Sequence, residues 1–421
     1  MNEEKRMAVR TSLPVASGGE EDAPLSVKGS PDIPMLLLTV ILILFGCVMV
    51  YSASAVYAEQ YHHDSTYFIV RHLIFALIGA AAMFLIIRFC TPVFWQDFAV
   101  ILFAISILLL LAVLVIGDDL GSGAKRWLNF GFITLQPSEV AKLALVMILA
   151  KYMTTYRDKV RSEYRFGGSF LYGVVYPGMI IAAVAGLIAL ERHISGLMIV
   201  GMLGISVMFL GGTKVRWIAA IGGAVIAAGC VLVLVSSYAQ ARVDTWLHID
   251  RADPLGAAWQ TLQGLLSFRD PFAKMSDEGY QLSQSLIALG SGGLFGTGLG
   301  NSQQKFGYVS QPQNDFIFTI VCEELGFFGA FFVVALFVMF VWRGFYIARH
   351  TTDAFSALVV YGLTFKVGLQ VALNIAVVTN SMPNTGISLP FFSYGGTSLV
   401  LQMIEVAIIL SISRYATHRK I

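Results

Sequence analysis

The chain has 421 residues, of which 57% are hydrophobic and only 13% are charged, and its formal net charge is +2. Soluble domains carry about 25% charged residues, so this chain lacks the polar surface that would cover it in water. The composition excludes a soluble enzyme, a disordered chain and a nucleic-acid-binding protein, and it predicts an integral membrane protein.

The two ends of the chain are polar. Residues 1–30 carry charges together with Gly and Ser, and the apolar run that follows them is too long for the core of a signal peptide. We therefore expect residues 1–30 to form a disordered cytoplasmic tail and residues 31–414 to form one membrane domain. Residues 415–421 are expected to form a second, short cytoplasmic tail.

Ten apolar segments are long enough to cross a bilayer, which takes about 20 mostly apolar residues in a helix. Four of them lie in windows without a charged residue, at 33–58, 98–117, 166–190 and 217–241. The other six are at 67–87, 137–153, 194–210, 316–341, 354–378 and 396–412. Because these runs lack the alternating pattern of barrel strands, the sequence predicts an all-α integral membrane protein with ten transmembrane helices.

Basic residues are distributed unevenly between the loops. If the N-terminus is cytoplasmic, seventeen Lys and Arg residues fall on the inner side and three or four on the outer side. Since inner loops are enriched in Lys and Arg, both termini are expected in the cytoplasm. One long outer loop, residues 237–314, then connects helices seven and eight. Its segment 280–290 has leucines on one helical stripe and ends at a glycine, so we expect an ordered helix on the outer membrane interface.

Several ionisable residues lie at membrane depth, where a charge costs roughly 2.5 to 3.5 kcal/mol and usually has a partner or a function. Glu139 and Lys142 share one helical face, and their spacing leaves open a self-neutralising pair or separate functional roles. Lys366 and Glu405 are candidates for a structural pair across the last two helices. Asp315 opens the eighth helix, either as an N-terminal cap or as a functional carboxylate.

Opposing effects act on the pKa of Asp315. Partial desolvation raises the pKa of a carboxyl group, whereas a helix N-terminus and nearby basic residues lower it. We expect the helix N-terminus and the nearby basic residues to dominate and to keep Asp315 largely ionised near neutral pH.

Other motifs carry less information. The four cysteines are Cys47, Cys90, Cys230 and Cys322. They lie in or beside apolar runs and have neither pairing nor metal-ligand spacing, so we expect core thiols, no disulfide and no metal site. The glycine-rich stretch 290–301 follows no predicted strand, which argues against a dinucleotide-binding loop.

Three longer stretches of the chain form a recognisable set. They are GAKRWLNFGFITLQPSEVAKL at residues 123–143, GYQLSQSLIALGSGGLFGTGLGNSQQKFGYVSQPQNDFIFTIVCEELGF at residues 279–327 and NTGISLPFFSYGGTSL at residues 384–399. Together they resemble the SEDS family, the ten-helix proteins of bacterial cell division, elongation and sporulation. The resemblance covers nearly all of the chain after residue 30. Within the family, residues 298–318 are similar to the division and sporulation members FtsW and SpoVE rather than to the elongation member RodA.

The resemblance implies a peptidoglycan glycosyltransferase of the bacterial cytoplasmic membrane, acting at the division septum. Such a protein polymerises lipid II, an undecaprenyl-pyrophosphate-linked disaccharide peptide, into β-1,4 glycan strands on the outer face of the membrane. Its implied partners are a class B penicillin-binding protein, which is a transpeptidase, and other division proteins, with no nucleic acid. Two alternatives remain, a lipid II flippase and a division-site scaffold for a transpeptidase.

The resemblance also implies roles for particular residues. The family's essential aspartate falls on Asp315, which would act as general base toward the attacking sugar hydroxyl. The chemistry also needs positive charge at the departing pyrophosphate, and we expect Lys125 and Arg126, on an outer loop, to supply it, alone or with a divalent cation and with no other cofactor. The substrate-binding candidates are polar residues of the matched and neighbouring segments: Lys125, Arg126, Glu139, Lys142, Glu191, His193, Gln284, Asn301, Glu323 and Ser393.

One segment departs from the family pattern. Many relatives have QPDLGT after the fifth helix, where this chain has ERHISG at residues 191–196. Glu191 and His193 keep an acidic and polar character, but no carboxylate role can be carried over to the third position of the motif.

Overall fold

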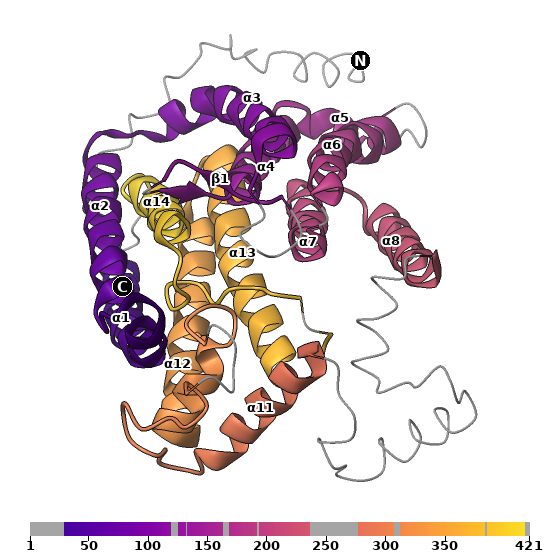
Figure 1. Cartoon of the computed structure of the whole chain (residues 1–421). Coiled ribbons are helices and arrows are strands. Elements are labelled where there is room, and N and C mark those ends of the chain that lie inside the picture. The colour runs from indigo at the N-terminus through magenta and orange to yellow at the C-terminus, as the bar shows by residue number, and fades with distance from the viewer. Residues whose placement is uncertain are drawn as a thin grey trace, which may run out of the picture.

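The computed structural model is mostly helical (Figure 1). It describes residues 29–118, 125–131, 133–162, 168–191, 193–235, 277–306, 312–383 and 385–416. Eight helices of this described part are long and apolar enough to cross a membrane, which is consistent with the expected all-α membrane protein. Nearly all of the two expected tails and most of the long loop at 237–314 lie outside the described residues.

Each of the ten apolar segments predicted from the sequence overlaps a helix. The eight segments that meet the length and apolarity criteria are α1 (Ile33–His62), α2 (Tyr67–Phe89), α3 (Pro92–Ile116), the π-helix η1 (Leu171–Val175) continued by α6 (Tyr176–Leu190), α7 (Ile194–Gly211), α12 (Ile317–His350), α13 (Ala354–Val378) and α14 (Gly396–Ser413). The other two are α4 (Pro137–Thr155) and α8 (Val215–Val235), and two shorter helices are α5 (Arg157–Arg161) and α11 (Asp277–Ser291). The helix predicted at 280–290 is confirmed, because α11 contains it.

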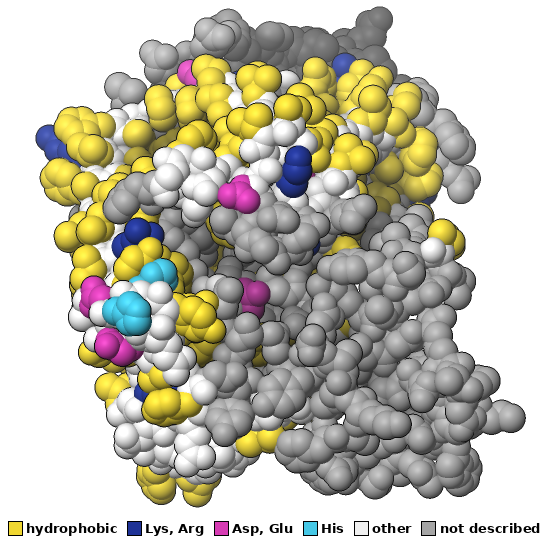
Figure 2. Space-filling view, in the orientation of Figure 1, with side chains coloured by type: hydrophobic (Ala, Val, Ile, Leu, Met, Phe, Trp, Pro, Cys, Tyr) yellow, Lys and Arg dark blue, Asp and Glu magenta, His cyan; other side chains and the backbone are white. Residues whose placement is uncertain are grey.

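The outward faces of the peripheral helices are apolar. On α3, the side chains of Leu108, Val115 and Ile116 are 65%, 76% and 70% exposed. Figure 2 shows hydrophobic side chains gathered over the upper part of the face in view, where α3 lies in Figure 1. A contiguous apolar surface of this kind needs a non-aqueous environment, as the low content of charged residues predicted.

Asp32 joins three helices at one end of the bundle. Its carboxylate caps α1 by accepting a hydrogen bond from the Met35 N–H at 2.9 Å. The same carboxylate forms an ion pair with Arg343 of α12 at 2.7 Å, and the Asp32 N–H donates to the Ser413 hydroxyl of α14 at 3.0 Å. These contacts align elements that are more than 300 residues apart in the sequence.

A small hairpin interrupts the all-helical pattern between α3 and α4. Strands β1 (Leu128–Asn129) and β2 (Thr134–Leu135) pair antiparallel, and Asp118 forms an isolated bridge with Trp127. The hairpin is fixed to the start of α14, because the Thr397 hydroxyl donates to the Thr134 carbonyl at 2.6 Å. The hairpin is a short exception within the mostly helical chain that the sequence did not predict, and it forms one wall of the site described below.

Helix α12 is kinked at Gly326, whose φ of +67° lies in the left-handed region that favours glycine. The glycine-rich stretch 290–301 packs its backbone against this kink. A side chain on Gly292 would overlap the carbonyl of Cys322, and one on Gly296 would overlap the carbonyl of Glu324. The glycines therefore permit close packing of two backbones, which explains the motif without a nucleotide.

The cysteines differ in their surroundings. Cys47 and Cys322 are buried, Cys90 is partly exposed and Cys230 is exposed, and all four are free thiols. The prediction of core thiols is therefore wrong for Cys230, because α8 turns that side chain outward.

Candidate functional site

A cavity of about 480 Å³ lies where α2, the β1–β2 hairpin, α4, α7, α13 and α14 converge. It collects side chains that are far apart in the sequence. Six of the predicted site residues line it: Arg126, Glu139, Lys142, His193, Asp315 and Ser393.

Asp315 precedes α12 and points its carboxylate into the neighbourhood of Gly386. The N-cap of α12 is Phe316, and no side chain caps this helix. The structure therefore does not support the helix-cap interpretation of Asp315. A Cβ on Gly386 would lie 3.1 Å from the Asp315 Oδ2 atom, and Gly386 has a φ of +64°. A glycine is needed here for its backbone conformation, and it leaves room for the carboxylate.

Backbone contacts hold the segment that carries Asp315. The Asn374 side-chain amide donates to the carbonyl of Asp315 at 2.8 Å and to the carbonyl of Ile387 at 2.6 Å. The Ser393 hydroxyl donates to the carbonyl of Asn314 at 2.8 Å and accepts from the Leu389 N–H at 2.7 Å. Ser393 was predicted to bind substrate, but its hydroxyl is engaged in joining two backbone segments.

The surroundings of Asp315 shift its pKa upward. Desolvation by the surrounding protein raises the pKa of Asp315 to about 6, and the nearby positive charge of Arg126 opposes the shift only in part. The expectation that cationic neighbours would dominate is therefore wrong in direction. The carboxyl group is nevertheless largely ionised at neutral pH, because its pKa stays below 7.

Four buried charged side chains form one network beside the cavity. Lys142 lies 2.5 Å from Glu139, and Lys366 lies 3.3 Å from Glu139 and 2.5 Å from Glu405. Both proposed pairs are confirmed as contacts, and the link between Glu139 and Lys366 joins them. Two acids thus face two bases, so the network is formally neutral. The sequence does not specify that link, because the two residues lie on different helices.

Glu191 and His193 are both buried but differ in position. His193 lines the cavity, and its Nδ1 atom lies 3.4 Å from the Ser138 hydroxyl. Burial, together with the positive charges of Lys142 and Arg126, lowers the pKa of His193 to about 3, so the ring is neutral at physiological pH. Glu191 does not line the cavity, and burial raises its pKa to about 8 against the opposing charge of Arg126.

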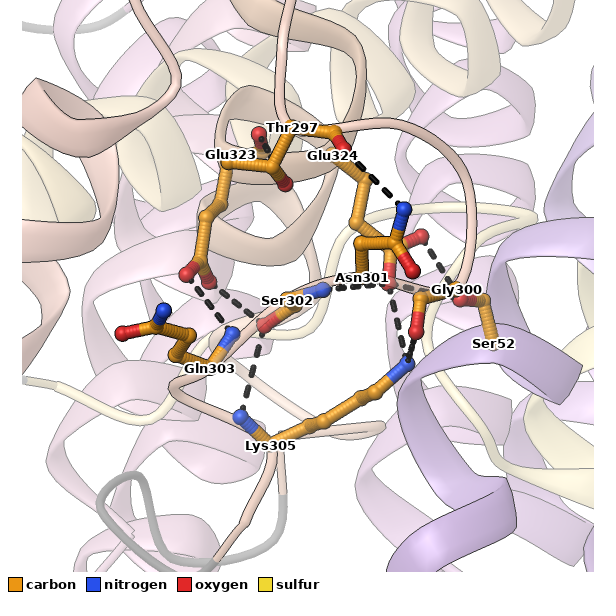
Figure 3. Close-up of polar contacts among 9 residues, drawn as sticks. All are labelled: Ser52, Thr297, Gly300, Asn301, Ser302, Gln303, Lys305, Glu323 and Glu324. Carbon is orange, nitrogen blue, oxygen red and sulfur yellow. Dashed lines mark hydrogen bonds and ion pairs between the residues drawn. The ribbon is translucent and has the colours of Figure 1, made fainter.

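Four of the predicted site residues lie elsewhere. Glu323 and Asn301 belong to a separate polar cluster (Figure 3). Gln284 is buried on α11 without lining the cavity, and Lys125 is exposed at the start of the hairpin. A residue in a motif shared with the family need not line the cavity, because the same motifs also contain residues that pack the fold.

The cluster in Figure 3 anchors the loop that follows α11. Glu323 accepts hydrogen bonds from the Ser302 hydroxyl at 2.5 Å and from the Gln303 N–H at 2.9 Å. Glu324 accepts from the Ser52 hydroxyl of α1 at 2.6 Å and pairs with Lys305 at 3.3 Å. Both carboxylates are at most 1% exposed, so they stabilise this loop rather than face a ligand.

Several cavity residues were not among the predicted site residues. Arg71 of α2, Gln370 of α13 and the first residues of α14 line the cavity. Gln370 shares a helical face with Lys366, and this polar stripe in an apolar helix is the sequence signal that points to it. Arg71 carries no comparable signal, because a basic residue near a helix end is common at a membrane interface. Within the described ranges, no three His, Cys, Asp or Glu side chains converge as metal ligands.

The sequence matches the family described as "Cell cycle protein", which comprises FtsW, RodA and SpoVE, over residues 33–418. Stage V sporulation protein E of Bacillus subtilis strain 168 is 36% identical over 394 residues, which cover 93% of this chain and 99% of that protein. A protein of Geobacter sp. strain M18, named probable peptidoglycan glycosyltransferase FtsW, is 35% identical over 385 residues, which cover 91% and 96%.

Solved structures share the fold. A chain in a structure on the coordination of polymerization and crosslinking by a peptidoglycan synthase complex superimposes with a TM-score of 0.66 at 23% identity, covering 91% of this chain and 98% of that one. The rod shape determining protein RodA of Thermus thermophilus gives a TM-score of 0.62 at 24% identity, covering 91% and 97%. The chain therefore belongs to the SEDS family of FtsW, RodA and SpoVE proteins.

Proposed function

We propose that this protein is a peptidoglycan glycosyltransferase that polymerises lipid II into β-1,4 glycan strands, with Asp315 as the general base. The names of its FtsW relatives support the reaction. One observation supports the role of Asp315. Two acidic residues line the described part of the cavity, and one of them, Glu139, is neutralised by Lys142 and Lys366. Asp315 forms no ion pair with any residue that the structure describes. Its carboxylate is therefore the one available to accept a proton.

The chemistry needs one base and one source of positive charge. The acceptor sugar hydroxyl attacks the anomeric carbon of the donor, its proton passes to Asp315, and the lipid pyrophosphate leaves with the bonding electron pair. The pyrophosphate is a good leaving group, so a second carboxyl group is less necessary than in glycoside hydrolysis. Arg126 lines the cavity, and in this proposal its positive charge stabilises the departing group. A single direct displacement inverts the anomeric centre and gives the β linkage.

The reaction is tested with purified protein, a cognate class B penicillin-binding protein and labelled lipid II. We expect glycan strands from this mixture and none when the protein is omitted. We further propose that the two proteins act together with other division proteins at the septum. The similarity to a chain of a peptidoglycan synthase complex supports the pairing. Failure of the complete mixture to form strands would contradict the proposed reaction.

The pH dependence of polymerisation should report the pKa of Asp315. Since the ionised form is the base and its pKa is about 6, activity should fall as the pH drops below 6, approaching tenfold per pH unit. His193 stays neutral through this range because its pKa is about 3. The control is Glu191→Gln, which should leave this acid limb in place because the pKa of Glu191 is about 8. Initial rates between pH 4.5 and 8 provide the measurement, and a flat profile through pH 6 contradicts the assignment.

The proposed topology has ten membrane helices in residues 31–414, both termini in the cytoplasm and the loop at 237–314 outside. The positive-inside distribution of Lys and Arg supports this orientation in the bacterial cytoplasmic membrane. It places the active cavity toward the outer face, where the lipid-linked substrate would arrive.

Reporter fusions should show this orientation directly. A reporter fused after Lys420 should read as cytoplasmic, and one inserted near Ser276 should read as external. The measurement uses two reporter enzymes at each position, one that is active only in the cytoplasm and one that is active only outside it. An external reading at Lys420 would rule out an even number of spans with the N-terminus inside.

A lipid II flippase is the main alternative, and the buried charges are its strongest support. A flippase needs polar groups at membrane depth that can interact with a moving head group. Here Lys366 and Glu405, which lie in the middle of α13 and α14, contact each other at 2.5 Å and are at most 1% exposed. Their mutual neutralisation favours a structural role for them, which in turn favours the enzyme.

A further inference from the structure

The N-terminus of α14 opens onto the cavity that contains Asp315. Gly395, Gly396, Thr397 and Ser398 all line this cavity. The N-cap of the 18-residue helix is Gly395, and no side chain caps it. The backbone N–H groups of residues 396–398 donate no hydrogen bond to any residue that the structure describes. Three backbone donors at the helix end that lines the cavity therefore have no acceptor among the described residues.

The first two residues of this helix end, Gly395 and Gly396, have no side chains. Gly396 packs directly on the ring of Phe75 of α2, and a side chain at Gly396 would overlap that ring. Gly395 contributes no side chain that could fold back over the amides. A helix N-terminus carries about half a positive charge, and its free N–H groups bind phosphate and carboxylate groups.

A second observation points to a ligand in the same cavity. Gln370 is 2% exposed and lines the cavity, and its Oε1 atom has no hydrogen-bond partner among the described residues. This oxygen is a hydrogen-bond acceptor, so a bound molecule with hydroxyl donors, as a sugar has, would satisfy it. The basic residues that line the described cavity are Arg71, Arg126 and Lys142, and the acidic ones are Glu139 and Asp315. This excess of one positive charge suits an anion.

We propose that the N-terminus of α14 binds the diphosphate of the polyprenyl-linked sugar donor. This inference rests on the proposed glycosyltransferase function and identifies which part of the cavity receives the leaving group. As the bond between the anomeric carbon and the diphosphate oxygen breaks, the electron pair moves to the diphosphate. The free N–H groups of α14 stabilise that added negative charge.

The fold also links this helix end to the segment that carries the base. The Tyr394 N–H, one residue before the N-cap, donates to the carbonyl of Gln313 at 2.8 Å. The Ser393 hydroxyl donates to the carbonyl of Asn314 at 2.8 Å. The segment that ends at Asp315 is thus bonded to the segment that starts α14. Base and diphosphate site are held as one unit, which is the preorganisation that displacement at the carbon between them requires.

The test places a carboxylate in the proposed site. Ser398→Asp adds a negative charge in the first turn of α14, where Asp is favourable for a helix, so folding should be preserved. Ser398→Asn is the matched control, with nearly the same shape and no charge. Binding of inorganic pyrophosphate and of farnesyl diphosphate to the purified full-length protein is measured by calorimetry in detergent, with inorganic phosphate as a weaker competitor. We expect Ser398→Asp to weaken binding of both diphosphates at least tenfold and Ser398→Asn to change it less than threefold.

The outcomes separate this inference from the proposed function. Asp315→Asn should bind pyrophosphate at least as tightly as the wild type, because it removes a negative charge from the cavity. If Ser398→Asp binds normally while Arg126→Gln does not, the diphosphate lies at the hairpin and the α14 site is wrong, whatever the role of Asp315. If the wild type binds neither diphosphate, the inference is also wrong. If Asp315→Asn still polymerises lipid II while Ser398→Asp loses diphosphate binding, the base assignment fails and the α14 site stands.

Discussion

Asp315→Asn should abolish glycan polymerisation while leaving membrane insertion and partner binding unchanged. Asn keeps the size of the side chain but cannot accept the proton of the attacking hydroxyl, and the other cavity carboxylate, Glu139, is paired with Lys142 and Lys366. Asn is also as good a helix cap as Asp, and α12 has no side-chain cap to lose. The loss would therefore be chemical rather than structural. Strand formation from labelled lipid II provides the measurement.

Two further substitutions at Asp315 refine this prediction. Asp315→Ala should be as inactive as Asp315→Asn. Asp315→Glu keeps the charge but moves it by one methylene, and a misplacement of about 1 Å can cost on the order of a hundredfold in rate. The matched control is Asp353→Asn, because Asp353 caps α13 by accepting from the Ser356 N–H at 2.8 Å, and Asn should replace it with little loss. Substantial polymerisation by Asp315→Asn would remove this residue from the mechanism.

Lys366→Met should cause the largest loss of stability of any single substitution in the charge network. Lys366 contacts both Glu139 and Glu405, so its removal leaves one uncompensated negative charge in a site where all partners are at most 7% exposed. Breaking a buried ion pair from one side costs about 3 to 5 kcal/mol. Thermal unfolding of the purified protein in detergent should show a correspondingly large fall in the transition temperature. Lys125→Met, at an exposed position, should change stability by about 0.5 kcal/mol or less.

Double substitutions test whether an uncompensated charge is the reason for the loss of stability. Adding Glu405→Gln to Lys366→Met leaves Glu139 paired with Lys142 and should recover part of the lost stability. Lys142→Met combined with Glu139→Gln leaves Lys366 paired with Glu405 and should likewise be more stable than Lys142→Met alone. If neither double variant recovers stability, the four residues do not act as one neutral network. Separate roles in the cavity would then be the better explanation for Glu139 and Lys142.

The sequence by itself determined the class of the protein, the positions of its helices and its family. Apolar runs are local signals, because about 20 apolar residues can bury their backbone polar groups only as a helix in a membrane. The contact between Glu139 and Lys142 was also predictable, since residues three apart on a helix lie on one face. The helix at α11 followed from its leucine stripe in the same way.

Only the tertiary structure decided which polar residues share a cavity. Glu323 and Asp315 are eight residues apart within one matched motif, yet Glu323 anchors a loop while Asp315 faces the cavity. Glu139 and Lys366 are joined across two helices by packing that no sequence interval specifies. The direction of the Asp315 pKa shift also depended on the fold, because desolvation is set by everything that packs around a carboxyl group and not by its neighbours in the chain. Local order thus followed from composition and spacing, whereas the chemistry of the site came from long-range contacts.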